Sequence, residues 1–318
     1  MVGFDKRKEV KLTPLEYATA GAISGMVMRV FAQPLDVLKI RFQLQVEDTA
    51  SHKAKYRGLI QASKLIFREE KISAFWKGHV PAQLLCIVFG SVQFVSFEWV
   101  TKAGHHILPY KWSHGNCKPA YHFVCGGIAG CAASVAAQPF DVVRTRLVAQ
   151  GEPKLYTGIS DAVRKMYVRE GVSSFYKGIS PTLLEIFPHA GLQFGFYAFF
   201  KLLWEQVFDI SRPDMTTGAM ESLFCGAASG ICSKAIILPL DVVKKRLQVQ
   251  GFEKARAQFG KVRMYDGISD CFVRIVKEEG IRGLFKGLSA SVVKGAVSVG
   301  LTFLVYEQCC NYMRARHR

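Results

Sequence analysis

Six long apolar stretches recur along the chain and are separated by polar sequence. They lie near residues 17–38, 79–100, 121–143, 180–204, 220–243 and 288–312. Each is close to the ~20 residues that a helix needs to cross the ~30 Å hydrocarbon core of a bilayer. Each also carries some polar side chains, which fits helices that line a water-filled cavity better than helices surrounded by lipid. The pattern predicts an all-α membrane protein with six transmembrane helices, which places both termini on the same side of the membrane.

A hexapeptide with a proline, an acid and a base occurs three times. The copies are PLDVLK from Pro34, PFDVVR from Pro139 and PLDVVK from Pro239. A second motif follows each copy and ends in Lys-Gly, with the sequences EKISAFWKG, EGVSSFYKG and EGIRGLFKG. Three agreeing copies of two motifs indicate tandem repeats. We place these repeats at residues 14–112, 118–207 and 217–314.

Each repeat reads as a spanning helix, a polar loop, a short amphipathic helix and a second spanning helix. In the first repeat the amphipathic segment covers residues 59–67, with apolar residues at helical spacing and basic residues between them. Such a helix suits the membrane interface, although an ordinary surface helix would show the same pattern. Near the start of each repeat two glycines stand four residues apart, which lets two helices approach closely.

The formal net charge of +17 raises the possibility of nucleic-acid binding. The basic residues cluster in connecting segments such as residues 53–68, so we expect solvated loops near anionic lipid instead. The nine cysteines are odd in number and form no C-x-x-C pair, which favours small buried side chains over disulfides or metal ligands. The common enzyme motifs for phosphate loops, zinc helices and nucleophile elbows do not occur. We therefore predict no enzyme, no cofactor and no metal site.

The repeated motifs, in this order, resemble the mitochondrial carrier family over residues 17–312. One departure is Lys71, which stands where the family usually has glycine and is expected to alter at most one turn. Stretches at residues 78–83, 92–94, 187–194 and 251–257 resemble the members of this family that carry thiamine pyrophosphate. The resemblance implies a pseudo-threefold barrel in the mitochondrial inner membrane, with short amphipathic helices on the matrix side and both termini on the intermembrane-space side. It also implies transport by alternating access. We further expect a monomer, with cardiolipin at the amphipathic helices.

Each hexapeptide places an acid and a base three residues apart on one face of a helix, after a proline that bends it. The pairs are Asp36 with Lys39, Asp141 with Arg144, and Asp241 with Lys244. Two arrangements are open. Three local pairs would contribute only ~0.2–0.5 kcal/mol each, whereas a ring could join each acid to the base of a neighbouring helix. The resemblance implies the ring, which would close the matrix end of the cavity.

The family's opposite gate has an aromatic residue, an acid and a base on each even-numbered helix. In this chain the matching charges are Glu98, Lys201 and Glu307, so two acids face one base. At most one good ion pair can form among them. We therefore expect a weak gate on the intermembrane-space side and a resting preference for the state that is open to that side.

Counting seven residues past each Lys-Gly step gives one position on each even-numbered helix, and counting seven residues back from each motif aspartate gives one on each odd helix. The resemblance matches the first set to substrate contact points of the family. Intramembrane charges are costly and usually functional. The predicted substrate-binding residues are Arg29, Leu85, Glu185, Ile186, Lys234 and Lys294. Structural roles stay open: Arg29 and Lys234 could bind a backbone carbonyl or Glu185, and Glu185 could neutralise Lys294.

Three cations against one acid suit a substrate with a polyanionic end and a cationic or donor-bearing end. A diphosphate would bind the cations, and Glu185 would meet the thiazolium or aminopyrimidine ring of thiamine pyrophosphate. We therefore expect import of this phosphorylated molecule, in exchange for nucleotides or other phosphorylated anions. A nucleotide or coenzyme A carrier of the same family, and a basic membrane protein that transports nothing, are the alternatives.

Overall fold

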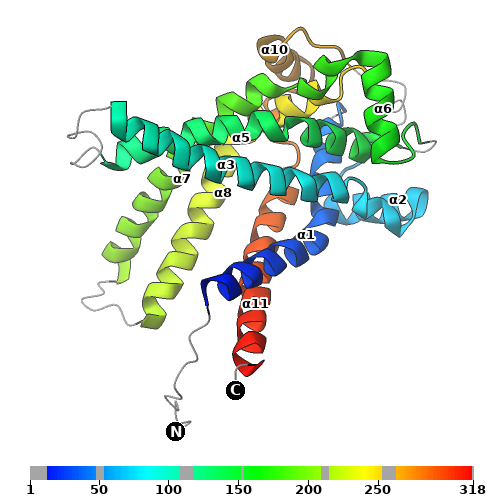
Figure 1. The fold of residues 1–318 in the computed structure, drawn as a ribbon. Coiled ribbons are helices and arrows are strands. Elements are labelled where there is room, and N and C mark those ends of the chain that lie inside the picture. The colour runs from blue at the N-terminus through cyan, green and yellow to red at the C-terminus, as the bar shows by residue number, and fades with distance from the viewer. Residues whose placement is uncertain are drawn as a thin grey trace.

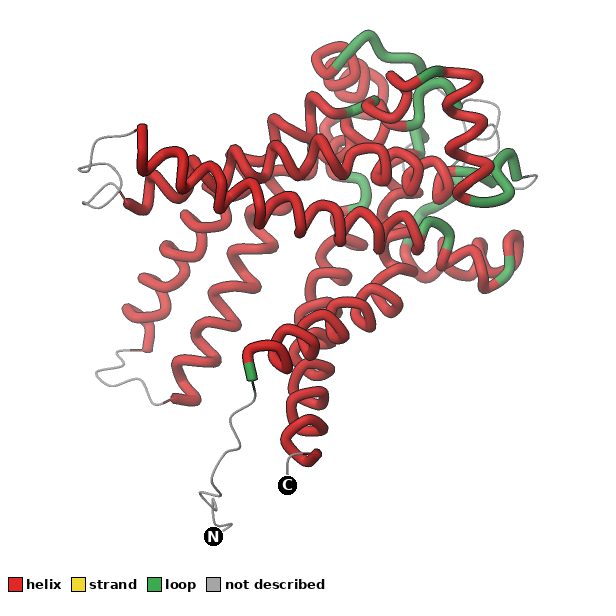
Figure 2. Tube along the Cα trace, in the orientation of Figure 1, coloured by secondary structure: helices red, strands yellow, loops and turns green. Residues whose placement is uncertain are grey.

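The computed structural model describes residues 13–47, 54–107, 118–151, 154–208, 215–252 and 263–316, and over these ranges it is helical with no strand (Figure 2). Its long helices are α1 (Pro14–Leu44), α3 (His79–Ile107), α5 (Lys118–Ala149), α7 (Ile179–Phe208), α8 (Met215–Gln248) and α11 (Leu288–Arg316). Its short helices are α2 (Leu59–Glu70), α6 (Ile159–Glu170) and α10 (Ile268–Glu279). A 3-10 turn follows each short helix: η1 (Ile72–Trp76), η2 (Val172–Tyr176) and η4 (Ile281–Phe285). The expected all-α fold of three helix-pair repeats is thereby confirmed.

The long helices pack most closely across the repeat boundaries. α1 packs against α11, α3 against α5, and α7 against α8. These three pairs diverge from the end of the molecule where α2, α6 and α10 lie (Figure 1). The start of α1 and the end of α11 meet at the opposite end, where Ala20 and Cys310 share a small buried cluster. The three helix pairs therefore lie together at the end with the short helices and spread apart from one another toward the other end.

Four segments are long and apolar enough to cross a membrane by length and composition. They are Ile72–Gly104, Ala120–Ala149, Glu221–Gln248 and Ile281–Arg316. α1 falls outside this set and carries charged side chains at Glu16, Arg29, Asp36, Lys39 and Arg41. α7 also falls outside it. Charged residues on a spanning helix must face a cavity or a partner. Most of those on α1 lie at the end of the molecule with the short helices, where they have partners.

Lys71 takes the backbone conformation of the glycines at the same place in the other repeats. Its φ and ψ are 66° and 176°, against 75° and −176° for Gly171 and 71° and −177° for Gly280. This region of backbone space is almost confined to glycine. The turn between α2 and η1 therefore keeps its shape, and the departure at Lys71 introduces local strain instead of a different turn.

Three buried arginines close the repeats into a ring, each two residues past the base of the hexapeptide. Nε of Arg41 donates to the carbonyl oxygen of Val148 at 3.2 Å, and Nε of Arg146 donates to that of Gln248 at 3.2 Å. Arg246 completes the cycle by donating to the carbonyl oxygen of Gln43 at 3.2 Å. Each repeat is thus joined to the next, and the third is joined back to the first.

The same arginines anchor the short helices through glutamates at their ends. Arg41 pairs with Glu70, Arg146 with Glu170 and Arg246 with Glu279. Lys77, Lys177 and Lys286, from the Lys-Gly steps, bind the same three carboxylates. Burial alone would raise the pKa of Glu70 and Glu170, but the hydrogen bonds and charges of these cations outweigh burial and hold both pKa values below the ordinary range.

Candidate substrate site and gate

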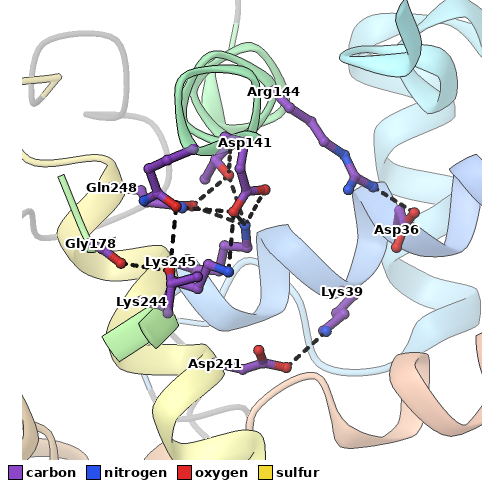
Figure 3. A network of polar contacts seen from close by, with 12 residues as sticks. Asp36, Lys39, Asp141, Arg144, Gly178, Asp241, Lys244, Lys245 and Gln248 are labelled. Carbon is purple, nitrogen blue, oxygen red and sulfur yellow. Dashed lines mark hydrogen bonds and ion pairs between the residues drawn. The ribbon is translucent and has the colours of Figure 1, made fainter. Parts of the chain in front are cut away.

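The acids of the hexapeptides pair with bases of neighbouring repeats, as Figure 3 shows. Nη2 of Arg144 lies 2.6 Å from Oδ2 of Asp36, and Nζ of Lys39 lies 3.1 Å from Oδ2 of Asp241. Nζ of Lys244 lies 3.4 Å from Oδ2 of Asp141. Of the two arrangements that the sequence left open, the structure therefore contains the ring.

The glycines of the Lys-Gly steps pack against the backbone of the bases in the ring. Gly78, Gly178 and Gly287 have φ values of +74°, +75° and +83°. A Cβ at these positions would lie 3.1, 3.0 and 3.1 Å from the carbonyl oxygens of the neighbouring gate bases, Arg144, Lys244 and Lys39 respectively. Only glycine allows both this backbone conformation and this approach. The second long helix of each repeat thus starts directly against the neighbouring gate.

Each gate acid also binds a second cation. Nζ of Lys294 lies 2.6 Å from Oδ1 of Asp36, and Nζ of Lys234 lies 2.5 Å from Oδ2 of Asp241. Asp141 receives its second cation from Lys245, at 2.9 Å. Lys294 and Lys234 keep 34% and 31% of their side-chain surface exposed, whereas Lys245 keeps 10%. Two of the second cations are therefore partly exposed, and the third is part of the buried ion-pair ring.

Lys245 is not among the site residues that the sequence predicted. Its Nζ also donates to Oγ1 of Thr145 at 3.0 Å and to Oε1 of Gln248 at 2.9 Å, and Nε2 of Gln248 donates to Oδ2 of Asp141 at 2.8 Å (Figure 3). The position after the motif base is Ile40 in the first repeat and Thr145 in the second. A charge that appears in one copy only was the signal that could have identified it.

The charged residues of the predicted binding site pair differently from what the sequence suggested. Oε1 of Glu185 lies 3.4 Å from Nζ of Lys244, so Glu185 neutralises a gate base and not Lys294. Lys234 pairs with a gate acid and not with Glu185. Arg29 donates from Nη1 to the carbonyl oxygen of Ala82 at 3.2 Å and contacts the sulfur of Cys86 with Nη2. For Arg29 the backbone-carbonyl alternative is therefore the one present.

A cavity of about 910 Å³ adjoins the gate and is lined by α3, α5, α7 and α8. Leu85, Glu185, Ile186 and Lys234 line it, and Asp141, Arg144 and Lys244 form its charged end. Arg29 and Lys294 do not belong to its walls. The structure thus brings together four of the six predicted binding residues and sets two apart, one against α3 and one against Asp36.

The charges predicted for the opposite gate do not meet. Glu98 pairs with Lys102 one turn along the same helix, at 2.7 Å, and the two side chains are 54% and 73% exposed. Within the described part of the chain, no ion pair joins Glu98, Lys201 and Glu307. Among the described residues, the ring of ion pairs therefore closes the end with α2, α6 and α10, and no such ring joins the three charges at the other end.

Comparison with known proteins agrees with this architecture. The family model described as mitochondrial carrier protein matches residues 10–106, 115–207 and 216–317. The mitochondrial thiamine pyrophosphate carrier of Bos taurus is 48% identical over 316 residues, covering 98% of this chain and 97% of its own length. The protein of that name from Homo sapiens is 47% identical over 321 residues, covering 100% and 98%. The mitochondrial thiamine diphosphate carrier 1 of Arabidopsis thaliana is 38% identical over 316 residues, covering 94% of both chains.

Three matches of one family model, one for each helix-pair repeat, account for nearly the whole length of the chain. They indicate a transporter of the mitochondrial inner membrane and not an enzyme. The chain belongs to the mitochondrial carrier protein family.

Proposed function

We propose that the protein imports thiamine pyrophosphate into the mitochondrial matrix by alternating access, in exchange for nucleotides or other phosphorylated anions. The substrate follows from near-full-length relatives in animals and plants that bear its name. The charge at the closed end of the cavity supports it. Six cations meet four acids there, which leaves an excess of positive charge for a diphosphate. The six cations are Lys39, Arg144, Lys234, Lys244, Lys245 and Lys294.

Lys234 and Lys294 link substrate binding to the gate. In the empty protein each is bound by a gate acid, Asp241 and Asp36 respectively. An arriving diphosphate competes with these carboxylates for the two ammonium groups. Each acid then keeps one cation instead of two, so the closed gate loses part of its stabilisation when the site is occupied. A ligand shifts a conformational equilibrium only through such a difference in interaction between the two states.

The gate formed by the hexapeptides faces the matrix in this proposal, and the opposite gate of Glu98, Lys201 and Glu307 is weak. Two acids and one base cannot complete a ring, and Glu98 has a partner of its own in Lys102. The protein therefore rests open to the intermembrane space, with both termini on that side. Ready labelling of the inhibitor-free carrier from the matrix side, and poor labelling from outside, would contradict this preference.

The short helices lie against the membrane surface in the proposed monomer. Ile60 and Phe67 of α2 are 74% and 56% exposed, and Val168 of α6 is 74% exposed. Exposed apolar side chains on amphipathic helices suit the boundary between headgroups and acyl chains. Anionic cardiolipin is the lipid expected beside the basic residues of these segments.

Exchange of labelled thiamine pyrophosphate by the purified protein in liposomes tests the proposal. We expect saturable uptake when the vesicles contain thiamine pyrophosphate or nucleotide, and uptake near background when they are empty. Unlabelled coenzyme A and nucleotides are the competitors that separate the alternatives. Faster exchange of either one than of thiamine pyrophosphate would assign the carrier to that substrate. No exchange of any of them would favour a membrane protein that does not transport.

A further inference from the structure

The cavity next to the gate is lopsided. α3, α5, α7 and α8 form its walls, and none of its lining residues comes from α1 or α11. Asp141, Arg144 and Lys244 line it beside the gate, and Phe89, Phe123 and Phe194 also line it, at positions of α3, α5 and α7. Phe123 and Phe194 keep 37% and 71% of their surface exposed. One cavity therefore joins a charged end to an aromatic wall.

Glycines of α5 keep a gap open between the two parts. A Cβ on Gly127 would overlap the ring of Phe187, and a Cβ on Gly130 would lie 3.3 Å from Cγ2 of Ile186. Side chains of α7 therefore already occupy the space over these two glycines. Gly126 differs, because no atom lies within 4 Å of an added Cβ and the residue lines the cavity. The space over Gly126 is thus empty and bordered by the aromatic wall.

The distance along α5 suits a substrate that is bound at both ends. Ser134 lines the cavity at the level that the repeats assign to Lys234, and Gly126 lies eight residues earlier on the same helix. Eight residues correspond to ~12 Å along a helix axis. A diphosphate held by Lys234 would therefore direct the rest of the molecule along α5 toward Gly126 and Phe123.

We propose that Phe89, Phe123 and the space over Gly126 form a subsite for the heteroaromatic half of the substrate. Aromatic side chains stack on planar rings and attract cations to their faces, so this wall suits a cationic thiazolium joined to an aminopyrimidine. The inference rests on the proposed function. It places the rings away from Glu185, which is occupied by Lys244, contrary to what charge alone suggested from the sequence.

The test is the affinity of the detergent-purified protein for two probes, thiamine pyrophosphate and inorganic pyrophosphate, which lacks the rings. In Gly126→Val the added Cβ meets no atom within 4 Å, and the side chain takes up space in the subsite. We expect this variant to bind thiamine pyrophosphate about tenfold or more weakly, as a misfit in an apolar pocket does, and to bind pyrophosphate as the wild type does. Phe123→Leu keeps an apolar side chain but removes the ring. It should also lower the affinity for thiamine pyrophosphate and leave the affinity for pyrophosphate unchanged.

Gly226→Val is the matched control. Gly226 begins the same glycine step in the third repeat and also has no atom within 4 Å of an added Cβ, but it does not line the cavity. This variant should bind both probes as the wild type does. The subsite would be overturned if Gly126→Val and Phe123→Leu bound thiamine pyrophosphate as the wild type does, or if they lost affinity for both probes equally. Exchange by the wild type would still support the proposed function in that case. Failure of the wild type to bind thiamine pyrophosphate would overturn both.

Discussion

Nζ of Lys245 lies 2.9 Å from Oδ1 of Asp141, across the boundary between the third and second repeats. The two side chains are 10% and 11% exposed, so the pair is nearly sealed from solvent. Lys244, the base that the hexapeptide supplies, lies farther from the same carboxylate, at 3.4 Å, and also pairs with Glu185. Asp141 therefore depends on a lysine outside the repeated motif.

Replacing this lysine should weaken the closed gate. In Lys245→Gln the Asp141 carboxylate loses its nearest cation while Lys244 remains, so we expect a loss of about 2 kcal/mol from the empty, closed protein. Thermal unfolding of the purified carrier measures the change. The effects of Lys245→Gln and Asp141→Asn should be non-additive by more than ~0.5 kcal/mol, because the two residues interact directly. Lys102→Gln, which breaks an exposed pair, is the control and should change little. Additive effects would remove Lys245 from the gate.

Neutralising Asp141 should cripple transport. Asp141→Asn leaves Lys245 and Lys244 without their shared carboxylate at the buried end of the cavity, which is costly. We expect exchange in liposomes to fall at least about tenfold, the equivalent of ~1.4 kcal/mol in the barrier. Reversing the charges with Asp141→Lys and Lys244→Asp should restore part of the rate only when Lys245→Gln is added, since Lys245 would otherwise repel the new lysine. Full exchange by Asp141→Asn would exclude this ion pair from the mechanism.

The repeats made most of the fold predictable. Proline, acid and base recur at matching places in three copies, so the ring of Asp36, Asp141 and Asp241 follows once the copies are placed around one axis. The closest helix packing could not be read in the same way. It joins helices of different repeats, such as α3 with α5, and no local pattern in either helix names its partner.

The binding site was less predictable than the gate because its residues do not follow the threefold symmetry of the repeats. Counting from the motifs found Lys234 and Lys294, but it could not show that gate acids already hold both in the empty protein. It also missed Lys245, which occurs in one repeat only, and the place of Gly126 in the cavity wall, which Gly226 does not share. Positions that break the threefold pattern are determined by packing between repeats, and packing is not visible in a sequence period.

If Lys234 and Lys294 serve both the gate and substrate binding, replacing either one should lower both the stability of the empty protein and the affinity for the substrate. Lys234→Gln removes one of the two cations on Asp241 and one ligand of the diphosphate. We expect a lower unfolding temperature of the empty protein and, separately, a smaller stabilisation by saturating thiamine pyrophosphate, with KM raised about tenfold. Lys294→Gln should behave alike through Asp36. A lower unfolding temperature with unchanged ligand stabilisation and KM would restrict both lysines to the gate.

The strained backbone at Lys71 offers a stabilising change. Its φ of 66° with ψ of 176° costs an L-residue about 1–3 kcal/mol, part of which glycine would lose again through its greater freedom in the unfolded chain. We expect Lys71→Gly to raise the free energy of unfolding by about 1 kcal/mol. Gly171→Lys is the reciprocal control, since an added Cβ there meets no atom within 4 Å and the cost is purely conformational. It should destabilise by a similar amount, and a Lys71→Gly variant less stable than the wild type would contradict the strain.

Glu170 should make the stability of the carrier fall in acid. Burial raises its pKa, but the hydrogen bonds and charges of Arg146 and Lys177 lower it further, so the folded-state pKa lies below the ordinary value. Because the folded pKa is depressed, the stabilisation is fully present above the unfolded pKa of about 4.3 and is lost as the pH falls through the folded pKa. Glu170→Gln leaves the buried Arg146 without a carboxylate and should cost about 3 kcal/mol at pH 7.

The pH profile separates this electrostatic effect from a simple packing defect. The unfolding temperatures of the wild type and Glu170→Gln should differ most at neutral pH and converge only as the pH falls through the lowered folded-state pKa of Glu170, because the protonated wild-type side chain then resembles glutamine. Glu278→Gln is the matched control, since Glu278 pairs with Arg263 at the surface, where the two side chains are 37% and 41% exposed. It should follow the wild type at every pH within about 0.5 kcal/mol. A difference between Glu170→Gln and the wild type that stays constant from pH 7 to pH 3 would show that the carboxylate charge does not hold α6 to the gate.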